Sequence, residues 1–489
     1  MTVKLQRPIL VGGVGLSYAI WLWQSFHDSI AQVSEFAVLT ILVVGAGFWF
    51  FQGKTSQKID FSPSASIKDR ATVEKAIAQA ETMIKQLETE TVNQHIIAHL
   101  QDKATNLTTE LDRKELQLTV TGGKGVGKTN LMQVLQYNWV PKQTISLQET
   151  PALFSATNTE NKEVPLSSDL VLFVTAGDLT DTEFQTLQQL KTANQRTILV
   201  FNKQDQYLPP ERATVLQKLR QHMHPILSTE DVVAIASSPV QVKVRQHQQD
   251  ASVQEWMEEQ KPDLTALTER LNQIITQESQ QLVWASTIRL AVALKAEAKN
   301  ELNKVRGDRA LPIIEQYQWI AAATAFANPV PALDLLATAA ISAQLVVEIG
   351  EIYQQKFSFS QAQIAVKTIS SLMLKLGLVE LSTQTISGIL KSNAVTFIAG
   401  GAVQGISAAY LTRLAGLSLI EYFQELEQSE SNATGQFNLD RLGQKLQNVF
   451  QQNQRVAFLQ AFIKQGVARI LPESPKLELT DSETTVTAI

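Results

Sequence analysis

A glycine-rich segment limits what this chain can fold into more than any other feature of its sequence. It runs Gly122-Gly123-Lys124-Gly125-Val126-Gly127-Lys128-Thr129 and matches the pattern G-x-x-x-x-G-K-[ST]. In this pattern, backbone N–H groups surround phosphate oxygens, the lysine reaches the β- and γ-phosphates, and the last hydroxyl ligates Mg²⁺. The segment therefore predicts a phosphate-binding loop between a strand and a helix, with Lys128 and Thr129 in those two roles.

A second short motif follows downstream. Asn202-Lys203-Gln204-Asp205 reads N-K-x-D, a pattern in which a fixed carboxylate accepts both N–H donors on the edge of guanine. The alternative interpretation is a glycine turn beside an unrelated surface aspartate, and it requires two independent coincidences in one chain. The two motifs together predict a site for a guanine nucleotide with Mg²⁺.

Hydrophobic periodicity gives both motifs the context that they need. Residues 116–120 alternate as a strand does, and residues 130–137 carry apolar side chains at helical spacing. The other expected strands are residues 144–147, 170–175, 197–201 and 232–236, with helices expected at residues 181–193 and 209–222. Two of these strands are almost continuously apolar, which is typical of strands buried on both faces of a parallel sheet. The pattern predicts a doubly wound α/β domain with a mostly parallel sheet over residues 115–245.

The two motifs resemble those of the Era/Ras-like GTP-binding proteins, over about a quarter of the chain. Ala236-Ser237-Ser238-Pro239 is similar to the family's loop whose backbone supports the base. The resemblance implies that GTP is contacted by Gly122, Gly123, Lys124, Gly125, Val126, Gly127, Lys128, Thr129, Asn130, Asn202, Lys203, Asp205, Ser237 and Ser238. It also implies that Mg²⁺ is held by Thr129 and Glu149.

The switch segment departs from the family pattern. Glu149-Thr150-Pro151-Ala152-Leu153 stands where the family has D-x-P-G and one further residue. Glu149 can still hold a Mg²⁺-bound water through its longer side chain, whereas Leu153 cannot orient the attacking water as glutamine does in many small GTPases. Gly125 occupies the place where some relatives have an asparagine that recruits K⁺. We therefore expect slow GTP hydrolysis, and no catalytic residue is assigned.

Two further residues near the loop are unusual. The connection between Thr129 and Glu149 is short, so Thr144 is the one residue expected to report on the γ-phosphate or Mg²⁺. Lys124 stands where most relatives have a small residue. It is either a catalytic clamp on the γ-phosphate or an exposed charge that favours solubility.

The composition argues against several other kinds of site. The chain has no cysteine, which excludes disulfides, thiolate catalysis and cysteine-ligated metal clusters. Its formal net charge of −5 provides no basic field, so we expect no nucleic-acid partner. His95 and His99 share a helical spacing but have no evident carboxylate partner, which argues against a metal site there.

The N-terminal segment is predicted to enter a membrane. Two uncharged apolar runs, residues 8–26 and 36–51, predict a transmembrane helical hairpin in residues 1–55. Basic residues flank the pair, whereas the connection has no Lys or Arg; the flanking residues are Lys4, Arg7, Lys54 and Lys58. This charge pattern places both ends, and the GTP-binding domain, in the cytoplasm. A cleaved signal peptide ending near Ser29-Ile30-Ala31 is the alternative, and it leaves the second run unexplained.

Polar helical stretches flank the predicted GTP-binding domain. Residues 56–114 are expected to form a linker and amphipathic helices, and residues 246–309 a helical stalk that starts near Val253. We expect these helices to pack on each other between the membrane and the GTP-binding domain. A long coiled coil is the alternative, and it would need more regular heptads.

The C-terminal third changes to apolar helices rich in Ala and Gly. Residues 328–334, Asn-Pro-Val-Pro-Ala-Leu-Asp, and the glycine-rich stretch after residue 393 resemble the YcjF-type domain of unknown biochemical function. In bacterial relatives that domain follows an Era-type domain. We therefore expect an all-α, hydrophobic YcjF-type domain in residues 310–425, then C-terminal helices and a disordered acidic tail in residues 426–489.

Whether these C-terminal helices cross the membrane is left open by their charges, which are Asp334, Glu348, Lys375 and Lys391. We expect a compact domain that rests on the membrane or lies partly in it. The expected partners are membrane lipids and either a protein effector or a second copy of the chain.

The sequence as a whole indicates a membrane-anchored GTP-binding protein. The preferred interpretation is a slow GTPase switch that uses Mg-GTP. The alternatives are a dynamin-like GTPase that remodels membranes, and a membrane scaffold that binds the nucleotide without turnover. The degraded switch segment favours the last of these, whereas helices on both sides of the domain favour the dynamin-like one.

Overall fold

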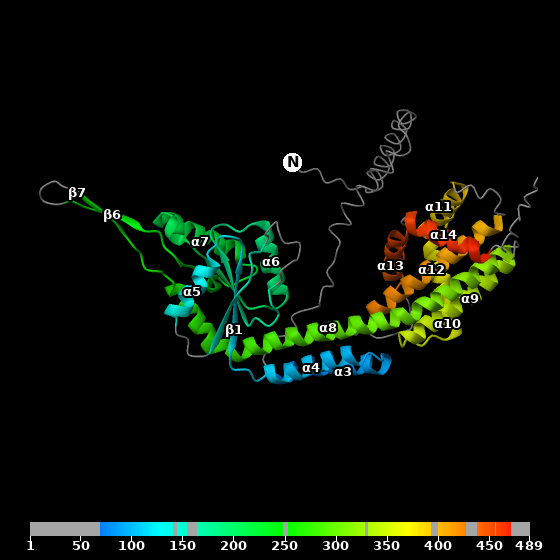
Figure 1. Cartoon of the computed structure of the whole chain (residues 1–489), viewed down its shortest axis with the longest axis horizontal. Helices are drawn as coiled ribbons and strands as arrows, with labels where there is room; N and C mark the ends of the chain where they lie inside the picture. Colours follow the sequence, from blue (N-terminus) through cyan, green and yellow to red (C-terminus); the bar gives the residue numbers. More distant parts are fainter. Residues whose placement is uncertain are drawn as a thin grey trace, which may run out of the picture. The chain divides into compact units, whose positions relative to one another are not determined.

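The computed structural model describes residues 69–139, 144–153, 164–247, 253–327, 331–392, 400–426, 438–454 and 456–470 (Figure 1). The predicted transmembrane hairpin in residues 1–55 and the predicted acidic tail after residue 470 lie outside these ranges. The chain divides into two compact units, residues 1–62 and 63–489, and the described residues all belong to the second. No helix within the described ranges combines the length and the apolar character needed to cross a membrane.

A five-stranded parallel sheet forms the centre of the α/β domain, as the sequence predicts. Its strands lie in the order β2-β1-β3-β4-β5, and all neighbours run parallel. Their bounds are β1 Leu116–Gly122, β2 Ile145–Glu149, β3 Leu170–Thr175, β4 Thr197–Phe201 and β5 Val232–Ala234. The strands β3 and β4 are buried at every position, which is why their sequences are continuously apolar rather than alternating.

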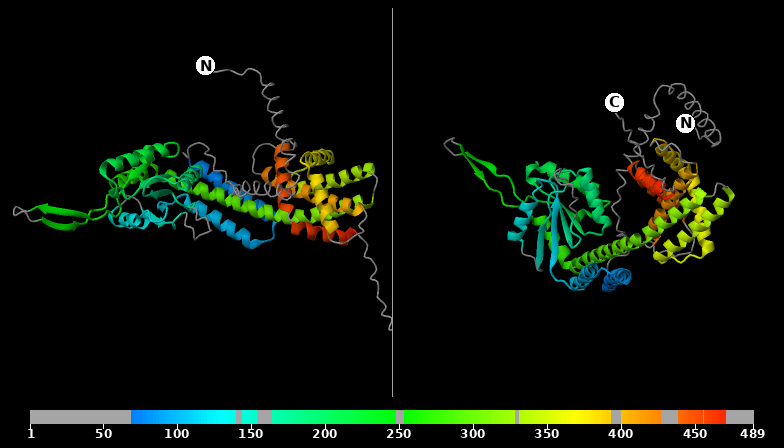
Figure 2. Two further views of the ribbon diagram at one scale, coloured as in Figure 1. Left: turned by 90° about the horizontal axis from the view of Figure 1, so that it is seen from above. Right: turned by 45° about the vertical axis from the view of Figure 1, so that its right-hand side comes forward.

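Helices cover both faces of this sheet (Figure 2). The helices α6 (Asp181–Thr192) and α7 (Pro209–Met223) pack on one face through Leu187, Leu190 and Leu219. The other face is covered by α5 (Lys128–Asn138) and by the start of α8 (Thr265–Ala327). Two short 3₁₀ turns, η1 (Gln204–Gln206) and η2 (Thr229–Asp231), lie beside the ends of the strands. The predicted doubly wound α/β class is therefore confirmed.

A β-hairpin follows the sheet where the sequence was expected to become helical. It joins β6 (Val242–His247) to β7 (Val253–Glu258) in antiparallel register. The expectation of a helix from Val253 is wrong for these residues. Cross-strand ion pairs connect Glu255 with Lys243 and Arg245, so charges that suit an exposed helix instead stabilise the hairpin.

The stalk is built from three helices. The helices α3 (Arg70–Glu90) and α4 (Gln94–Glu110) pack on the middle of α8 through a shared apolar core. This packing confirms the predicted stalk. The helix α8 spans 63 residues and continues through Pro312, although the sequence suggests a domain boundary near residue 309.

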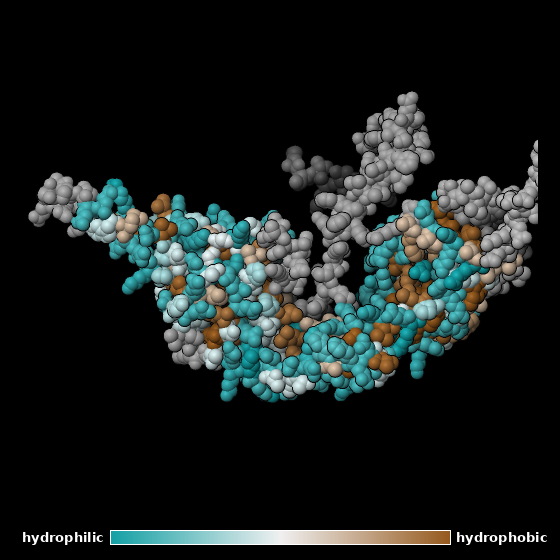
Figure 3. Space-filling view, viewed as in Figure 1, coloured by the Kyte–Doolittle hydropathy of each residue, from teal (hydrophilic) through white to brown (hydrophobic). Residues whose placement is uncertain are grey.

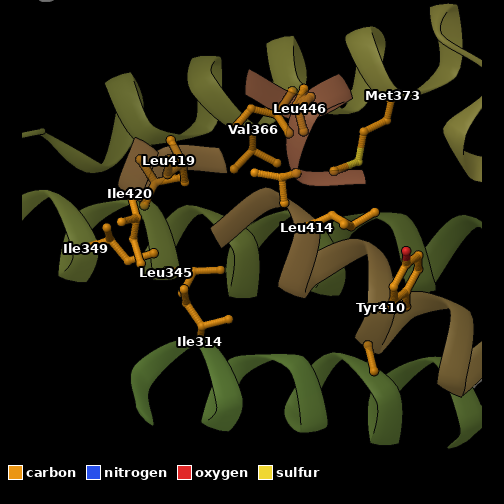
Figure 4. Packing of buried hydrophobic residues seen from close by; sticks show 14 of the residues in the cluster. Ile314, Leu345, Ile349, Val366, Met373, Tyr410, Leu414, Leu419, Ile420 and Leu446 are labelled. Carbon is orange, nitrogen blue, oxygen red and sulfur yellow. The ribbon is translucent and has the colours of Figure 1, made fainter. Parts of the chain in front are cut away.

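The C-terminal region is entirely helical within the described residues. It contains α9 (Pro331–Ile352), α10 (Phe359–Lys375), α11 (Leu378–Ser392), α12 (Gly400–Leu426), α13 (Leu439–Asn453) and α14 (Val456–Ile470). These helices and the end of α8 enclose one large apolar core (Figure 4). Apolar side chains also reach the surface of these helices (Figure 3), and Ile364 and Leu374 of α10 are the most exposed, at 65% and 67%.

Candidate nucleotide-binding site

The predicted phosphate loop lies at the point where the strand order reverses. From β1 the chain moves to β2 on one side and later to β3 on the other. In sheets of this order, ligands bind beyond the carboxyl ends of the two strands that flank the reversal. The loop leaves the end of β1 at Gly122 and enters α5 at Lys128, so the predicted strand–loop–helix context is present.

Two glycines of the loop cannot be replaced by other residues without a clash. Gly122 has φ +144°, and an added Cβ would lie 2.2 Å from the carbonyl oxygen of Val174. Gly127 has φ +91°, and its added Cβ would lie 2.4 Å from the side-chain nitrogen of Asn202. Both positions need the backbone conformation that glycine adopts most readily. The motif's first glycine is therefore required by the close approach of β3, and its last glycine by the side chain of Asn202.

Lys128 lies under the loop rather than in solvent. It is 6% exposed, and its ammonium group donates to the carbonyl oxygens of Gly122 and Gly123 at 3.1 and 2.7 Å. Burial lowers the pKa of Lys128, and the negative charge of Glu149 opposes this effect. The loop thus holds a positive charge beside its own backbone, in the position that the phosphate motif requires.

The two predicted Mg²⁺ ligands lie together. The hydroxyl group of Thr129, in the first turn of α5, donates to the carboxylate of Glu149 at the end of β2 over 3.0 Å. Thr129 follows the loop at the end of β1, and Glu149 is the last residue of β2, which pairs in parallel with β1. A hydroxyl and a carboxylate are hard oxygen ligands of the kind that Mg²⁺ prefers, and few protein ligands are needed because Mg²⁺ keeps several waters.

Asn202 connects the two sequence motifs. Its side-chain nitrogen donates to the carbonyl oxygen of Val126 in the phosphate loop and to the hydroxyl oxygen of Ser237, both at 2.9 Å. Its side-chain oxygen accepts from the backbone N–H of Ser237 at 3.0 Å. The residue is 1% exposed. Asn202 therefore acts as a structural link between the phosphate loop and the Ser237–Ser238 loop.

The two carboxylate oxygens of Asp205 differ in their hydrogen bonding. Its Oδ2 accepts from the backbone N–H of Val240 at 2.9 Å, whereas Oδ1 is buried and has no hydrogen-bond partner. Lys203 adopts φ +61° and donates to the carbonyl oxygen of Gly125 at 2.8 Å. Ser237 is buried and Ser238 is exposed. The N-K-x-D residues and the phosphate loop thus belong to one connected structure.

The switch segment continues the hydrogen bonding of β2 to β1 for one residue beyond the strand. The backbone N–H of Thr150 donates to Val120, and its buried hydroxyl donates to the hydroxyl of Thr121 at 2.8 Å. The backbone N–H of Leu153 donates to the carbonyl oxygen of Gly122 at 3.1 Å. The side chain of Leu153 packs on the core beneath α6 and α7, so it lies beside the loop but offers no polar atom.

Thr144 lies at the wrong end of the sheet for its predicted role. Its carbonyl oxygen accepts from the backbone N–H of Leu116, the first residue of β1. Because β2 runs parallel to β1, Thr144 is separated from the phosphate loop by the length of the strand, about 20 Å at ~3.3 Å per residue. The expectation that Thr144 reports on the γ-phosphate or Mg²⁺ is therefore wrong.

The remaining predicted contacts, Lys124 and Asn130, are exposed. Val240 and Thr121 have parts that the sequence does not reveal, because the first acts through its backbone N–H and the second through a common hydroxyl. Val126 is an expected contact of GTP, but its carbonyl bond to Asn202 is likewise made by the backbone. Backbone contacts carry no side-chain signal, so pattern analysis has no means of finding them.

Comparison with known proteins identifies the C-terminal region. Residues 289–455 match a family described as "Domain of unknown function (DUF697)". The helical region is therefore a DUF697 domain. This confirms the predicted YcjF-type domain, and the match extends it to include part of α8 and all of α13. A search of curated proteins found no match.

Two solved structures of bacterial dynamins are similar, at a low level, to about four fifths of the chain. One is LeoA, a bacterial dynamin GTPase from ETEC, with 11% identity, a TM-score of 0.22, and coverage of 82% of this chain and 98% of LeoA. The other is an oligomerised bacterial dynamin pair associated with long-range sensing and tethering of membranes, with 11% identity, a TM-score of 0.21, and coverage of 83% and 82%. TM-scores this low do not establish a common overall arrangement.

Proposed function

We propose that this chain binds Mg-GTP between the phosphate loop and the N-K-x-D motif, and works as a slow, membrane-anchored GTPase switch. The observation that carries the guanine assignment is the carboxylate of Asp205. One oxygen is held by the N–H of Val240, and the other is buried without a partner. A buried acceptor without a donor is costly. Guanine presents two N–H donors on one edge, and adenine has no matching pair.

The phosphate side of the site fits the same ligand. Lys128 and the backbone N–H groups at the start of α5 would hold the phosphates, and the positive end of the α5 dipole adds to the attraction. Thr129 and Glu149 would hold Mg²⁺, which neutralises phosphate charge when bound. These residues therefore suit a nucleoside triphosphate with its bound Mg²⁺.

Slow turnover follows from what surrounds the loop. Leu153 offers no polar atom for a water molecule, and Gly125 has no side chain that could recruit K⁺. The position of Thr144 far from the loop favours the second candidate function, a scaffold that binds nucleotide without turnover. A dynamin-like GTPase differs from both because lipid should stimulate its turnover.

Calorimetry with the full-length chain in non-ionic detergent tests nucleotide binding. We expect the wild type to bind Mg-GTP and to bind Mg-ATP far more weakly. Lys128→Ala should abolish GTP binding, and Lys114→Ala is the matched control because Lys114 is exposed just before β1. Equal affinity for GTP and ATP would contradict the guanine assignment, and unchanged GTP affinity in Lys128→Ala would contradict the site itself.

Phosphate release measured with and without liposomes separates the three functions. A slow GTPase turns over at a rate well below the ~10 s⁻¹ median for enzymes and is insensitive to liposomes. A scaffold releases no phosphate above the rate of Lys128→Ala. Strong stimulation by liposomes would favour the dynamin-like function instead.

A further inference from the structure

Buried polar atoms without partners are concentrated in the DUF697 domain. Seven such side-chain atoms occur in the described part of the chain. Four of them lie where the end of α8 meets α12; they are Trp319 Nε1, Ser407 Oγ, Tyr410 Oη and Arg413 Nε. Native proteins leave few buried polar atoms unpaired, so a local group of four requires a physical explanation.

Three of these groups surround the same pair of aromatic rings on α14. The ring of Trp319 stacks on Phe462 with centroids 5.4 Å apart, and Tyr410 meets Phe462 edge-on at 5.9 Å. The guanidinium carbon of Arg413 lies 5.6 Å from the ring centre of Phe458, which stacks on Phe462. The three side chains therefore meet at one junction of α8, α12 and α14.

The spacing on α12 is consistent with this junction. Ser407, Tyr410 and Arg413 follow one another at intervals of three residues, which places them along one side of the helix. The side chain of Arg413 also reaches α8, where it donates to the side-chain oxygen of Gln318 at 3.4 Å. Gln318 precedes Trp319 in the chain, so this contact brings Arg413 to the same part of α8.

All four side chains can donate hydrogen bonds, and Arg413 gives the cluster a positive charge. The Trp and Arg side chains have no acceptor at all. Burial raises the pKa of Tyr410 to about 12, so its hydroxyl keeps its proton at neutral pH. Burial lowers the pKa of Arg413, and the charge of Glu315 opposes this effect. No carboxylate lies within 4.0 Å of Arg413 among the described residues.

A phosphate group matches this set of donors better than a carboxylate. It carries negative charge and at least three acceptor oxygens, whereas a carboxylate has two oxygens. Arg and hydroxyl donors are common partners of phosphate. The rings of Trp319, Phe458 and Phe462 add an apolar wall, which suits a phosphate attached to an apolar body.

We propose that the junction of α8, α12 and α14 in the DUF697 domain is a phosphate-binding site formed by Trp319, Tyr410 and Arg413, with Ser407 at its edge. The phosphate is either a small soluble ion or the headgroup of an anionic lipid. This site is separate from the phosphate loop, and it does not depend on nucleotide binding.

Paired variants of the full-length chain in non-ionic detergent test the site. All carry Lys128→Ala, so that the phosphate loop does not contribute. Tyr410→Phe removes the hydroxyl that has no partner. Tyr317→Phe is the matched control, because the hydroxyl of Tyr317 donates to Glu348 at 2.5 Å. Without phosphate, Tyr410→Phe should melt no lower than its parent, whereas Tyr317→Phe should melt lower.

Melting is then measured with inorganic phosphate, with dihexanoylphosphatidate and with dihexanoylphosphatidylcholine. Loss of one charge-assisted hydrogen bond should weaken binding about tenfold or more in Tyr410→Phe, and Arg413→Met should show a similar loss. Tyr317→Phe should respond as its parent does. Phosphate salts stabilise proteins in general, and this effect acts on all variants alike.

Stabilisation by inorganic phosphate that Tyr410→Phe lacks supports a site for a small anion. Stabilisation by the phosphatidate alone supports a lipid headgroup. The proposal is overturned if neither probe distinguishes Tyr410→Phe from Tyr317→Phe. It is also overturned if Tyr410→Phe melts as low as Tyr317→Phe without phosphate, because the hydroxyl then has an internal partner.

Discussion

At the scale of single residues, the proposed choice of guanine rests on the carboxylate of Asp205. Replacing Asp205 by Asn exchanges an acceptor oxygen for an amide that donates, so guanine loses up to two charge-assisted hydrogen bonds. At ~1.5–3 kcal/mol each, the affinity for GTP should fall about a hundredfold or more. Xanthine nucleotide, which has an acceptor at the changed position, should bind the variant better than GTP.

Competition calorimetry with GTP and XTP on the wild type and Asp205→Asn measures this exchange. Recovery of affinity with XTP is the internal control, because it shows that the variant is folded. Weak binding of both nucleotides would leave a purely structural role for Asp205, through its bond to the N–H of Val240.

The residues that pattern analysis finds are those whose chemistry is local. Lys128, Thr129 and Asp205 fall in contiguous motifs, and the structure brings these motifs together through Asn202. Thr144 was misassigned because its place depends on the direction of β2, and direction is a property of strand pairing rather than of nearby residues. The buried donors at Trp319 and Tyr410 have no sequence signal, since they are recognisable only by the absence of a partner.

At the scale of elements, α8 is fixed to the base of the sheet by a buried charge cluster. Asp231 accepts from Arg196 at 2.7 and 3.0 Å and from Arg270 of α8 at 2.9 and 3.0 Å. Glu278 of α8 accepts from the same Arg196 at 2.9 Å. Burial acts to raise the pKa of Asp231, but hydrogen bonds from Arg196 and Ser228 outweigh it and lower the pKa below its ordinary value of 3.8.

The lowered pKa predicts an acid-sensitive contact between α8 and the sheet. Because the folded pKa lies below the unfolded one, Asp231 contributes stability above pH 3.8 that is lost as the pH falls through the folded value. Asp231→Asn should lower the urea concentration at the midpoint of unfolding at pH 7. The midpoint of this variant should also fall less steeply than that of the wild type as the pH is lowered. The control is Asp112→Asn, whose pair with Arg70 is exposed. Parallel pH curves for Asp231→Asn and the wild type would refute the prediction.

A second charged contact joins α3 to α8. Glu90 at the end of α3 accepts from Arg306 at 2.7 Å; Arg306 is fully buried and Glu90 is 11% exposed. Removing one partner of a buried pair costs about 3–5 kcal/mol. Glu90→Gln should therefore lower the free energy of unfolding by that order. Glu297→Gln removes a half-exposed pair with Lys103 and should cost about 1 kcal/mol or less.

Urea titration of the two variants, followed by far-UV circular dichroism, makes the comparison. Equal losses in Glu90→Gln and Glu297→Gln would show that the junction of α3 and α8 is not a buried electrostatic contact.

The sequence predicts some strands and helices better than others, and the differences have physical causes. The strands β3 and β4 were found at their observed bounds because a doubly buried strand has a continuous apolar run. The hairpin of β6 and β7 was missed because its loop has no Gly or Asn-Gly turn and its charges suit an exposed helix. The helix α8 passes through Pro312 because packing on both sides of that residue, at Ala310 and Ile314, outweighs the lost backbone hydrogen bond.

At the scale of the whole molecule, α8 belongs to three apolar cores. Its first turns complete the core under the sheet through Leu267 and Leu271, and its middle packs with α3 and α4 through Leu294 and Leu302. Its last third enters the DUF697 core through Ile314. One helix therefore contributes side chains to the cores of the α/β domain, the stalk and the C-terminal domain.

The sequence predicts that the membrane anchor lies in residues 1–55. Residues 8–26 and 36–51 are the two long apolar runs on which this prediction rests. Deleting residues 1–62 removes the first compact unit and leaves the second unit whole. The truncated chain should therefore leave the membrane pellet in alkaline carbonate, while the full-length chain stays in it.

Circular dichroism and Mg-GTP binding serve as controls for folding of the truncated chain. Retention of the folded, truncated chain in the carbonate-resistant pellet would mean that helices of the DUF697 domain are themselves integral to the membrane.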